Sequence, residues 1–353
     1  MSAASVATQR VPEVKARSVV ANLDCLRSFA VLSVLVSHGM VMTTSILTGK
    51  PIYYPWGAVG VMAFFVHTSL VLMLSLERMH RSSPDALARR FYIRRLFRLY
   101  PLSILCVAVT MLFQLPAGYV LGTEYRPFTP GAVVANLLLV QNFFTHRTIA
   151  GPMWSLPYEV DMYLVLPFLF YVAIRKDSWK IFIWAILAFS VLGFVVRLML
   201  GHTNILGYVP CFLAGVFAFS VRKLLVPRIP AAVWPIFLLV WFTIFGSLLK
   251  DRPMTEQFLV QWSLCFLLGV SIYLFHESQN RVWNRVTAII AKYSYGIYLS
   301  HMPAIWLVVR TFKITEPVTM MAMWLFITAI GSVLAYHLLE GPMINVGRKF
   351  SDR

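Results

Sequence analysis

Charge is scarce in this sequence. Of its 353 residues only 13% are Asp, Glu, Lys or Arg, while 59% are hydrophobic. A soluble chain of this length carries about 25% charged residues. Acidic side chains are rarer than basic ones, with 14 Asp and Glu against 31 Lys and Arg. This composition excludes an ordinary soluble domain and indicates an integral membrane protein with most of its chain in the bilayer.

The basic excess does not indicate a nucleic-acid partner. A net charge of +17 fits such a partner in principle. The lysines and arginines, however, lie in short segments between apolar runs, which is typical of the cytoplasmic loops of membrane proteins. We therefore predict contact with membrane lipid and none with nucleic acid.

Cysteine is also rare, and repeats and low-complexity tracts are absent. The four cysteines lie in or beside apolar runs, without C-x-x-C or Cys/His ligand spacing. We interpret them as small core residues and predict no metal site. The polar, basic N-terminus has no apolar segment of its own, so the first apolar run is predicted to be a retained span rather than a signal peptide.

Ten apolar runs are long enough to cross a hydrocarbon layer of ~30 Å. They lie at about 27–47, 58–76, 98–116, 155–174, 181–199, 205–221, 231–249, 257–275, 293–311 and 317–338. An eleventh stretch, 131–145, is too short to span. The sequence therefore predicts an all-α polytopic membrane protein with about ten transmembrane helices plus a short re-entrant or interfacial helix.

The distribution of basic residues gives an orientation. With the N-terminus inside, 23 of the 31 lysines and arginines fall on the inner side and 8 on the outer side. Because cytoplasmic segments are enriched in Lys and Arg, both termini are predicted to be cytoplasmic. The predicted division is a cytoplasmic tail 1–21, one transmembrane domain 22–340 and a cytoplasmic tail 341–353.

Arg27 and His38 form the most informative pair. Eleven helical residues turn about 20° beyond three full turns, so both side chains lie on one face, with a rise of about 16 Å between them. An arginine at the membrane edge would thus stand below an imidazole near the midplane, which suggests a polar passage rather than lipid contact. A local ion pair between Asp24 and Arg27, at i and i+3, is the alternative for the arginine.

The densest basic segment is RRFYIRRLFRLYP, residues 89–101, on the predicted inner side. Arg94 and Arg98 share a helix face, and Arg95 lies one turn from Arg98. Guanidinium groups bind phosphate oxygens in a bidentate way, so several together can hold a polyanionic molecule. Contact with anionic lipid explains the same residues and remains open.

The segment 151–167, GPMWSLPYEVDMYLVLP, opens the fourth span from the outer side. Glu159 and Tyr163 share a face at i and i+4, and Trp154 offers a stacking surface for a sugar-like acceptor. Carboxylates here can bind hydroxyls or orient a histidine. An interfacial tryptophan beside solvated acids is the alternative.

Two further histidines lie in predicted spans. His301 stands about midway along the ninth span, one turn after Tyr298, and His67 lies in the second span. Either one serves interhelical hydrogen bonding or chemistry, and three intramembrane histidines together also allow a proton path.

These segments together resemble the membrane-bound acyltransferase-3 family over nearly the whole chain. Arg27 and His38 match its opening motif, Arg95 and Arg98 its cytoplasmic arginine motif. Trp154, Ser155 and Glu159 match its W-S-L-x-x-E segment, and SYGIYLSH and YHLLEGP match its last two blocks. FFVHTSLVL departs from the family pattern at His67, which puts the acyl or acceptor preference in question.

The resemblance implies transfer of an acyl group, usually acetyl, from cytoplasmic acyl-CoA to a hydroxyl of a glycan, lipid-linked sugar or natural product. It implies His38 as general base, with Glu159 orienting the acceptor or the imidazole. The CoA phosphates would be held by Arg27, Arg95 and Arg98. The acceptor would lie near Trp154, Ser155, Tyr163 and His301.

The same resemblance implies a bacterial inner membrane and no permanently bound cofactor, with acetyl-CoA as the donor substrate. A proton-coupled transporter of a sugar or metabolite, using the intramembrane histidines and Glu159, is the main competing hypothesis. The acceptor, the acyl chain length and the oligomeric state are not given by the sequence.

Overall fold

The computed structural model describes residues 20–118, 124–145, 147–200, 204–250, 252–314 and 316–352. The first nineteen residues of the predicted N-terminal tail 1–21, and Arg353 at the end of the predicted C-terminal tail, lie outside the described residues.

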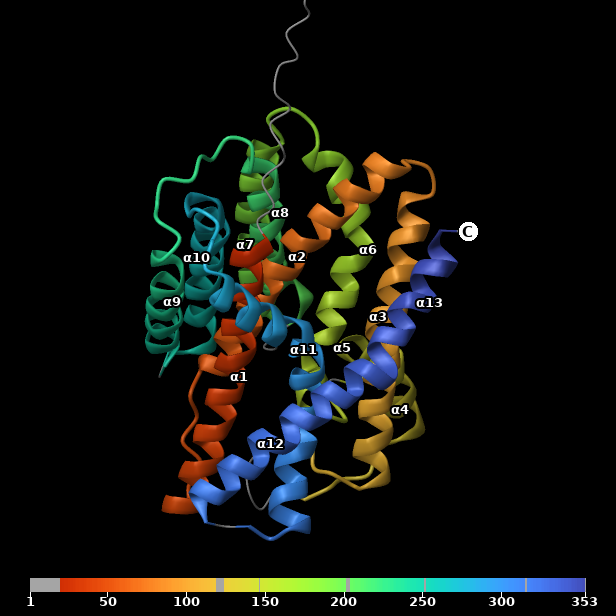
Figure 1. Cartoon of the computed structure of the whole chain (residues 1–353), viewed down its shortest axis with the longest axis vertical. Helices are drawn as coiled ribbons and strands as arrows, with labels where there is room; N and C mark the ends of the chain where they lie inside the picture. Colours follow the sequence, from red (N-terminus) through yellow and green to blue (C-terminus); the bar gives the residue numbers. More distant parts are fainter. Residues whose placement is uncertain are drawn as a thin grey trace, which may run out of the picture.

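The described residues form a bundle of helices without a β-strand (Figure 1). One isolated bridge joins Ile229 and Phe275. The longer helices are α1 (Val20–Thr48), α2 (Trp56–Ser82), α3 (Leu87–Leu112), α6 (Leu156–Ala173), α7 (Ser178–Leu200), α8 (Val209–Val221), α9 (Val233–Leu249), α10 (Met254–Ser271), α11 (Arg281–Trp306), α12 (Pro317–Ala335) and α13 (Gly341–Ser351). The short elements are α4 (Pro130–Leu137), α5 (Gln141–Phe144), the 3₁₀ turns η1 (Gly151–Trp154), η2 (Ile205–Gly207) and η3 (Ile272–Leu274), and the π turns η4 (Leu307–Thr311) and η5 (Tyr336–Glu340).

All ten predicted apolar runs are helical, and the chain is an all-α polytopic membrane protein. Seven helical segments are long and apolar enough to cross a membrane, and α8 and α9 are shorter apolar helices. The remaining run belongs to α11, which has 26 residues and carries Arg281, Arg285 and Lys292 in its first half. Figure 1 shows the start of α1 and the end of α13 toward the same end of the bundle.

The stretch 131–145 is too short to span, as predicted. It forms α4, of 8 residues, and α5, of 4 residues. Eight residues rise only ~12 Å at 1.5 Å each. The Asn136 side chain fixes this segment, since its amide donates to the Arg147 carbonyl at 2.9 Å and its oxygen accepts from the Ile149 amide at 2.9 Å.

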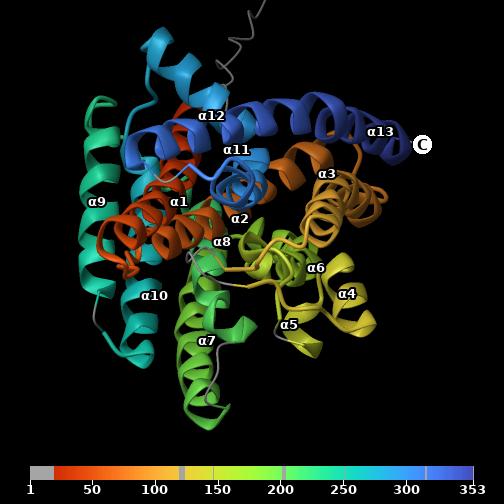
Figure 2. The ribbon, with the colours of Figure 1, turned by 90° about the horizontal axis from the view of Figure 1, so that it is seen from below.

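The centre of the bundle is built from α2 and α8, which are largely buried, and α8 is apolar on all sides. Figure 2 places them near the middle, with α7, α9 and α13 at the periphery. Close packing depends on glycine here. A Cβ on Gly60 would lie 2.5 Å from the Ala30 carbonyl oxygen of α1, and one on Gly215 of α8 would meet Val66 of α2.

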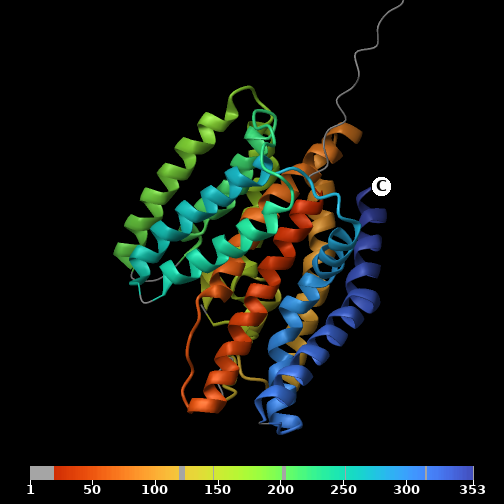
Figure 3. The ribbon, with the colours of Figure 1, turned by 60° about the vertical axis from the view of Figure 1, so that its left-hand side comes forward.

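The outer face of α7 is apolar and exposed. Trp184, Val191 and Met199 are 71%, 66% and 78% exposed, and Figure 3 shows this light-green helix at the edge of the bundle. Side chains of this kind are stable when lipid tails cover them. The exposed apolar surface therefore fits a protein embedded in a bilayer.

The predicted C-terminal tail is helical through Ser351. The turn η5 joins α12 and α13 into one continuous segment of 35 residues, Pro317–Ser351. Its end packs along α3, where Arg94 donates to the Asp352 carboxylate at 2.7 Å and to the Ser351 hydroxyl at 2.8 Å. The hydrogen bond from Arg94 holds the pKa of Asp352 below its usual range.

Candidate active site

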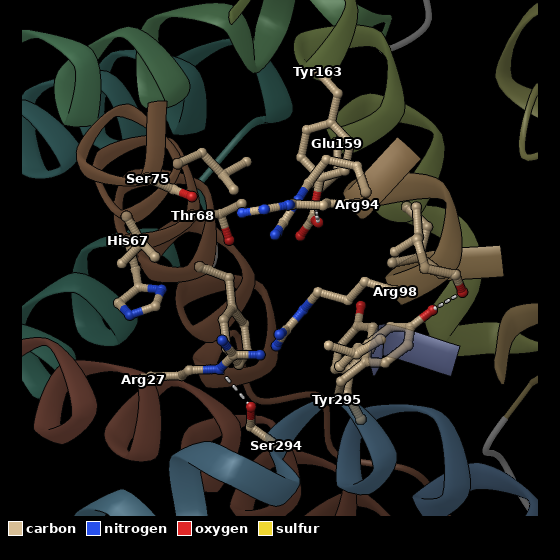
Figure 4. Close-up of a pocket in the computed structure, with 18 of the residues that line it drawn as sticks. Arg27, His67, Thr68, Ser75, Arg94, Arg98, Glu159, Tyr163, Ser294 and Tyr295 are labelled. Carbon is tan, nitrogen blue, oxygen red and sulfur yellow. Dashed lines mark hydrogen bonds between the residues drawn. The ribbon is translucent and has the colours of Figure 1, made fainter. Parts of the chain in front are cut away.

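A cavity of about 540 Å³ lies between α1, α2, α3, α6, α11 and α13 (Figure 4). We call it the arginine cavity. Its arginines are Arg27, Arg78, Arg90, Arg94, Arg95, Arg98 and Arg348. One carboxylate, that of Glu159, lines the same space. Because arginine stays protonated in proteins, the cavity holds a large excess of positive charge.

The guanidinium groups of Arg27 and Arg98 enter this cavity from opposite walls and face one another (Figure 4). Two like charges facing each other in a bundle interior repel strongly, since the surroundings screen them poorly. An anion placed between them converts this repulsion into two charge-assisted hydrogen bonds. The geometry of this pair is therefore that of an anion-binding site.

The arginines are only partly satisfied by the protein itself. Arg27 Nε donates to the Ser294 hydroxyl at 2.5 Å, and Arg98 lies 3.8 Å from the buried Glu340 carboxylate. The buried Nε of Arg95 has no hydrogen-bond partner within the described part of the chain. Several donors thus remain for a ligand.

Glu159 and Tyr163 belong to this cavity. The Tyr163 hydroxyl donates to the Glu159 carboxylate at 2.9 Å, as their i, i+4 spacing allows. The sequence predicted Tyr163 beside the acceptor and Glu159 orienting either the acceptor or the imidazole. Both side chains line the arginine cavity together with residues of α2 and α3, so Glu159 supplies negative charge among the arginines.

A second cavity, of about 620 Å³, lies at the opposite end of the bundle. We call it the histidine cavity. Loop residues Tyr54, Gly118 and Lys250 line its rim, and Trp154 contributes an aromatic wall. His38 of α1 and His301 of α11 also line it.

The two histidines are hydrogen-bonded to each other. His38 Nδ1 lies 3.0 Å from His301 Nε2, and the rings stack with centroids 5.0 Å apart. His301 Nδ1 lies 3.3 Å from the Ile297 carbonyl oxygen, which can only accept. With both rings neutral, His301 Nδ1 is therefore a donor and its Nε2 an acceptor, so that His38 Nδ1 donates. This tautomer leaves a basic lone pair on His38 Nε2.

The two cavities meet at Val61 and Tyr298, which line both of them among the described residues. The Tyr298 hydroxyl is hydrogen-bonded to the Ser155 hydroxyl at 2.9 Å. The predicted polar passage from Arg27 to His38 thus lies in two adjoining cavities that share Val61 and Tyr298 in their walls.

One face of α11 organises both cavities. Ser294, Tyr298 and His301 recur at i, i+4 and i+7, so they form a stripe along the helix. The first bonds Arg27 and the last bonds His38. Because α1 packs along α11, Arg27 and His38 of α1 each meet a hydrogen-bonding partner in this stripe of α11.

The predicted site residues divide between these two spaces. The arginine cavity is lined by Arg27, Arg95, Arg98, Ser155, Glu159 and Tyr163, and the histidine cavity by His38, Trp154 and His301. His67, whose role was left open, lines the arginine cavity; its buried Nδ1 has no hydrogen-bond partner among the described residues.

Sequence reasoning missed some of the residues that complete the site. The spacing of Ser294 and Tyr298 from His301 was a detectable helical signal. Arg348 gave no such signal, because it reaches the cavity only through the packing of α13 on α3. Across the described ranges, no three His, Cys, Asp or Glu side chains gather into a metal-binding group.

The fold and the two cavities define a polytopic membrane protein with a polycationic site on one side of a histidine pair. The chain belongs to a family of acyltransferase domains, whose profile matches residues 20–337. No solved structure matches the chain significantly.

Curated relatives cover nearly the whole chain. A putative peptidoglycan O-acetyltransferase of Bacillus subtilis is 25% identical over 94% of this chain and 56% of its own length. The peptidoglycan O-acetyltransferase OatA of Listeria monocytogenes is 23% identical over 96% and 58%. An O-acetyltransferase OatA of Staphylococcus aureus is 23% identical over 93% and 57%. The chain thus spans a little over half the length of these relatives.

Proposed function

We propose that this protein is a membrane O-acyltransferase that moves an acyl group, acetyl in the first instance, from cytoplasmic acyl-CoA to a hydroxyl of an acceptor. The observation that carries the proposal is the arginine cavity, with Arg27 and Arg98 facing one another across it. The family and the names of the relatives support the same reaction class.

Acyl-CoA fits the arginine cavity because its phosphates form a compact polyanion. Arginine forks match phosphate oxygens in geometry and charge. We propose that Arg27, Arg95 and Arg98 bind the phosphates of the donor, and that Glu159 holds these arginines apart around it. The pantetheine arm then extends toward Tyr298, which places the thioester at the boundary between the two cavities.

His38 is the general base of the proposed reaction. Its Nε2 lone pair takes the proton of the acceptor hydroxyl while that oxygen attacks the thioester carbonyl carbon. The carbon–sulfur bond then breaks, and His38 returns the proton to the departing CoA thiolate. The tautomer of His38 is fixed by His301, which makes Nε2 the basic nitrogen of the ring.

The acceptor is proposed to be a carbohydrate hydroxyl in the histidine cavity. Trp154, Tyr53 and Tyr54 line that space, and aromatic faces suit sugar rings. The relatives named for peptidoglycan O-acetylation make cell-wall glycan the first acceptor to test. We propose a bacterial inner-membrane location with both termini cytoplasmic, which puts the arginine cavity on the side where acyl-CoA is found.

Acyl transfer fits the site better than proton-coupled transport. A proton route through His67 and Glu159 would have to cross the arginine cavity, where positive charge opposes a proton. His38 and His301 are in the other cavity. His67 and Glu159 thus line one cavity, and His38 and His301 line the other.

The proposal is tested with purified protein in nanodiscs and acetyl-CoA labelled in the acetyl group. Soluble peptidoglycan fragments serve as the acceptor probe, and both CoA release and labelled glycan are measured. We expect turnover by the native chain and none by His38→Ala, which should still bind CoA because His38 lies outside the arginine cavity. Full turnover by His38→Ala would refute its role.

A matched pair of variants tests the donor site. Arg95→Ala with Arg98→Ala should abolish saturable acetyl-CoA binding. The control is Arg175→Ala with Lys176→Ala, which removes the same charge from an exposed turn after α6. Equal affinity in both double variants would favour lipid contact as the role of Arg95 and Arg98 and would overturn the donor assignment.

A further inference from the structure

We infer that the hydroxyls of Tyr298 and Ser155 form the oxyanion site of this protein, binding the carbonyl oxygen of the acyl thioester as negative charge develops on it. The inference rests on the proposed acyl transfer and assigns catalytic residues that the base and the arginines do not supply. Three observations support it: where the two hydroxyls lie, which hydrogen bonds they make, and how rigidly the two side chains are held.

Position is the first argument. Donor and acceptor enter from different cavities, so the carbon that links them must react where the cavities meet. Val61 and Tyr298 line both spaces in the described structure. The valine has no polar atom, so the Tyr298 hydroxyl and its partner, the Ser155 hydroxyl, are the polar groups at that boundary.

The hydrogen bonds of the two hydroxyls are the second argument. The two hydroxyls carry two protons and share one hydrogen bond of 2.9 Å, in which either oxygen can be the donor. One O–H therefore remains to be donated, and neither hydroxyl has another hydrogen-bond partner among the described residues. A carbonyl oxygen at the boundary accepts a hydrogen bond from this O–H, and as charge develops the shared hydrogen bond can give way so that both hydroxyls donate to the same oxygen.

Rigidity is the third argument, because an oxyanion site acts only if its donors are in place beforehand. Tyr298 is 7% exposed, and its ring packs edge-on against Phe64, with centroids 6.1 Å apart, and at a tilt against His301, with centroids 6.0 Å apart. Ser155 is buried between η1 and the first turn of α6. Neither side chain needs to move far to meet the carbonyl.

The bonds, electrons and proton of the proposed acyl transfer balance. The acceptor oxygen forms a bond to the carbonyl carbon, its proton goes to His38, and the carbonyl π electrons move onto the oxygen that Tyr298 and Ser155 hold. When that electron pair re-forms the double bond, the carbon–sulfur bond breaks. The thiolate leaves and takes the proton from His38.

The test measures kcat and acetyl-CoA affinity separately in Tyr298→Phe and Ser155→Ala. Loss of one oxyanion donor lowers kcat by roughly 10²- to 10³-fold, while the dissociation constant for CoA should stay within about twofold. The double variant should lose less than the product of the single effects, since the two hydroxyls act as one unit. The control is Tyr92→Phe, whose hydroxyl bonds the Leu164 carbonyl outside both cavities.

A graded series separates this role from a structural one. Fluorotyrosines placed at position 298 keep the ring shape and make the phenol a stronger donor, so kcat should rise with phenol acidity while thermal stability stays level. If kcat of Tyr298→Phe and of Ser155→Ala both stay within threefold of native while His38→Ala is inactive, the inference fails and the proposed function stands. If the native protein binds no acetyl-CoA and releases no CoA, both fail.

Discussion

Replacing Arg95 by methionine should weaken the binding of acetyl-CoA and, at the same time, stabilise the ligand-free protein. Arg95 lines the arginine cavity, and its buried Nε has no hydrogen-bond partner among the described residues. Methionine keeps much of the side-chain length and removes the charge. The variant therefore relieves repulsion among neighbouring arginines without breaking a hydrogen bond between described residues.

The size of the affinity loss follows from the type of contact removed. A hydrogen bond to a charged group contributes about 1.5–3 kcal/mol, and each 1.4 kcal/mol is a factor of ten in the dissociation constant. We expect acetyl-CoA to bind roughly 10- to 150-fold more weakly to Arg95→Met. The loss should shrink as salt is added, since salt already screens the phosphate charge.

The assay is isothermal titration calorimetry with CoA in nanodiscs at two salt concentrations, paired with thermal unfolding of the ligand-free protein. Arg175→Met is the matched control, because Arg175 is exposed on the turn after α6 and lines neither cavity. CoA without its 3′-phosphate reports whether Arg95 contacts that group, since the variant and the truncated ligand would then not lose affinity additively. An unchanged CoA affinity, or a lower melting temperature of the ligand-free variant, would show the reasoning to be wrong.

Three further outcomes are expected. His301→Phe should lower kcat roughly 10- to 100-fold by freeing the tautomer of the proposed base, with partial rescue in His301→Gln, whose amide oxygen can accept; equal rates in the two variants would argue against tautomer control. Gly60→Ala should lower the free energy of unfolding by about 1–3 kcal/mol because its Cβ would crowd a backbone oxygen of α1, whereas Gly131→Ala, with open space around it, should not. The lowered pKa of Asp352 means that its link to Arg94 is present at neutral pH and lost as the pH falls through that lowered pKa; hydrogen exchange in α13 should then rise, and Asp352→Asn should abolish this pH dependence.

Local periodicity was sufficient to predict the helices and one face of the site. The apolar runs gave the spans because a bilayer requires long unbroken helices. The eleven-residue step placed Arg27 and His38 on one face of α1, and both do line cavities on the side of α1 that packs against α11.

Local periodicity could not predict how helices that are distant in the sequence pack against each other. Glu159 was expected to orient the acceptor or the imidazole, and its place in the wall of the arginine cavity could not be read from the sequence of α6 alone. Tyr298 lines both cavities and meets Ser155, a residue 143 positions away in the sequence. Such contacts are set by how helices pack against each other, which no single helix period encodes.

The meeting of the two cavities at Val61 and Tyr298 has an electrical consequence. In the proposed orientation the two cavities open toward opposite faces of the membrane, so the transmembrane voltage would fall mainly across the region where they meet. Moving one elementary charge through the full drop is worth about 2.3 kcal/mol per 100 mV. The energy of the negative charge that forms there would therefore depend on the membrane potential, and the rate of the proposed reaction would vary with that voltage.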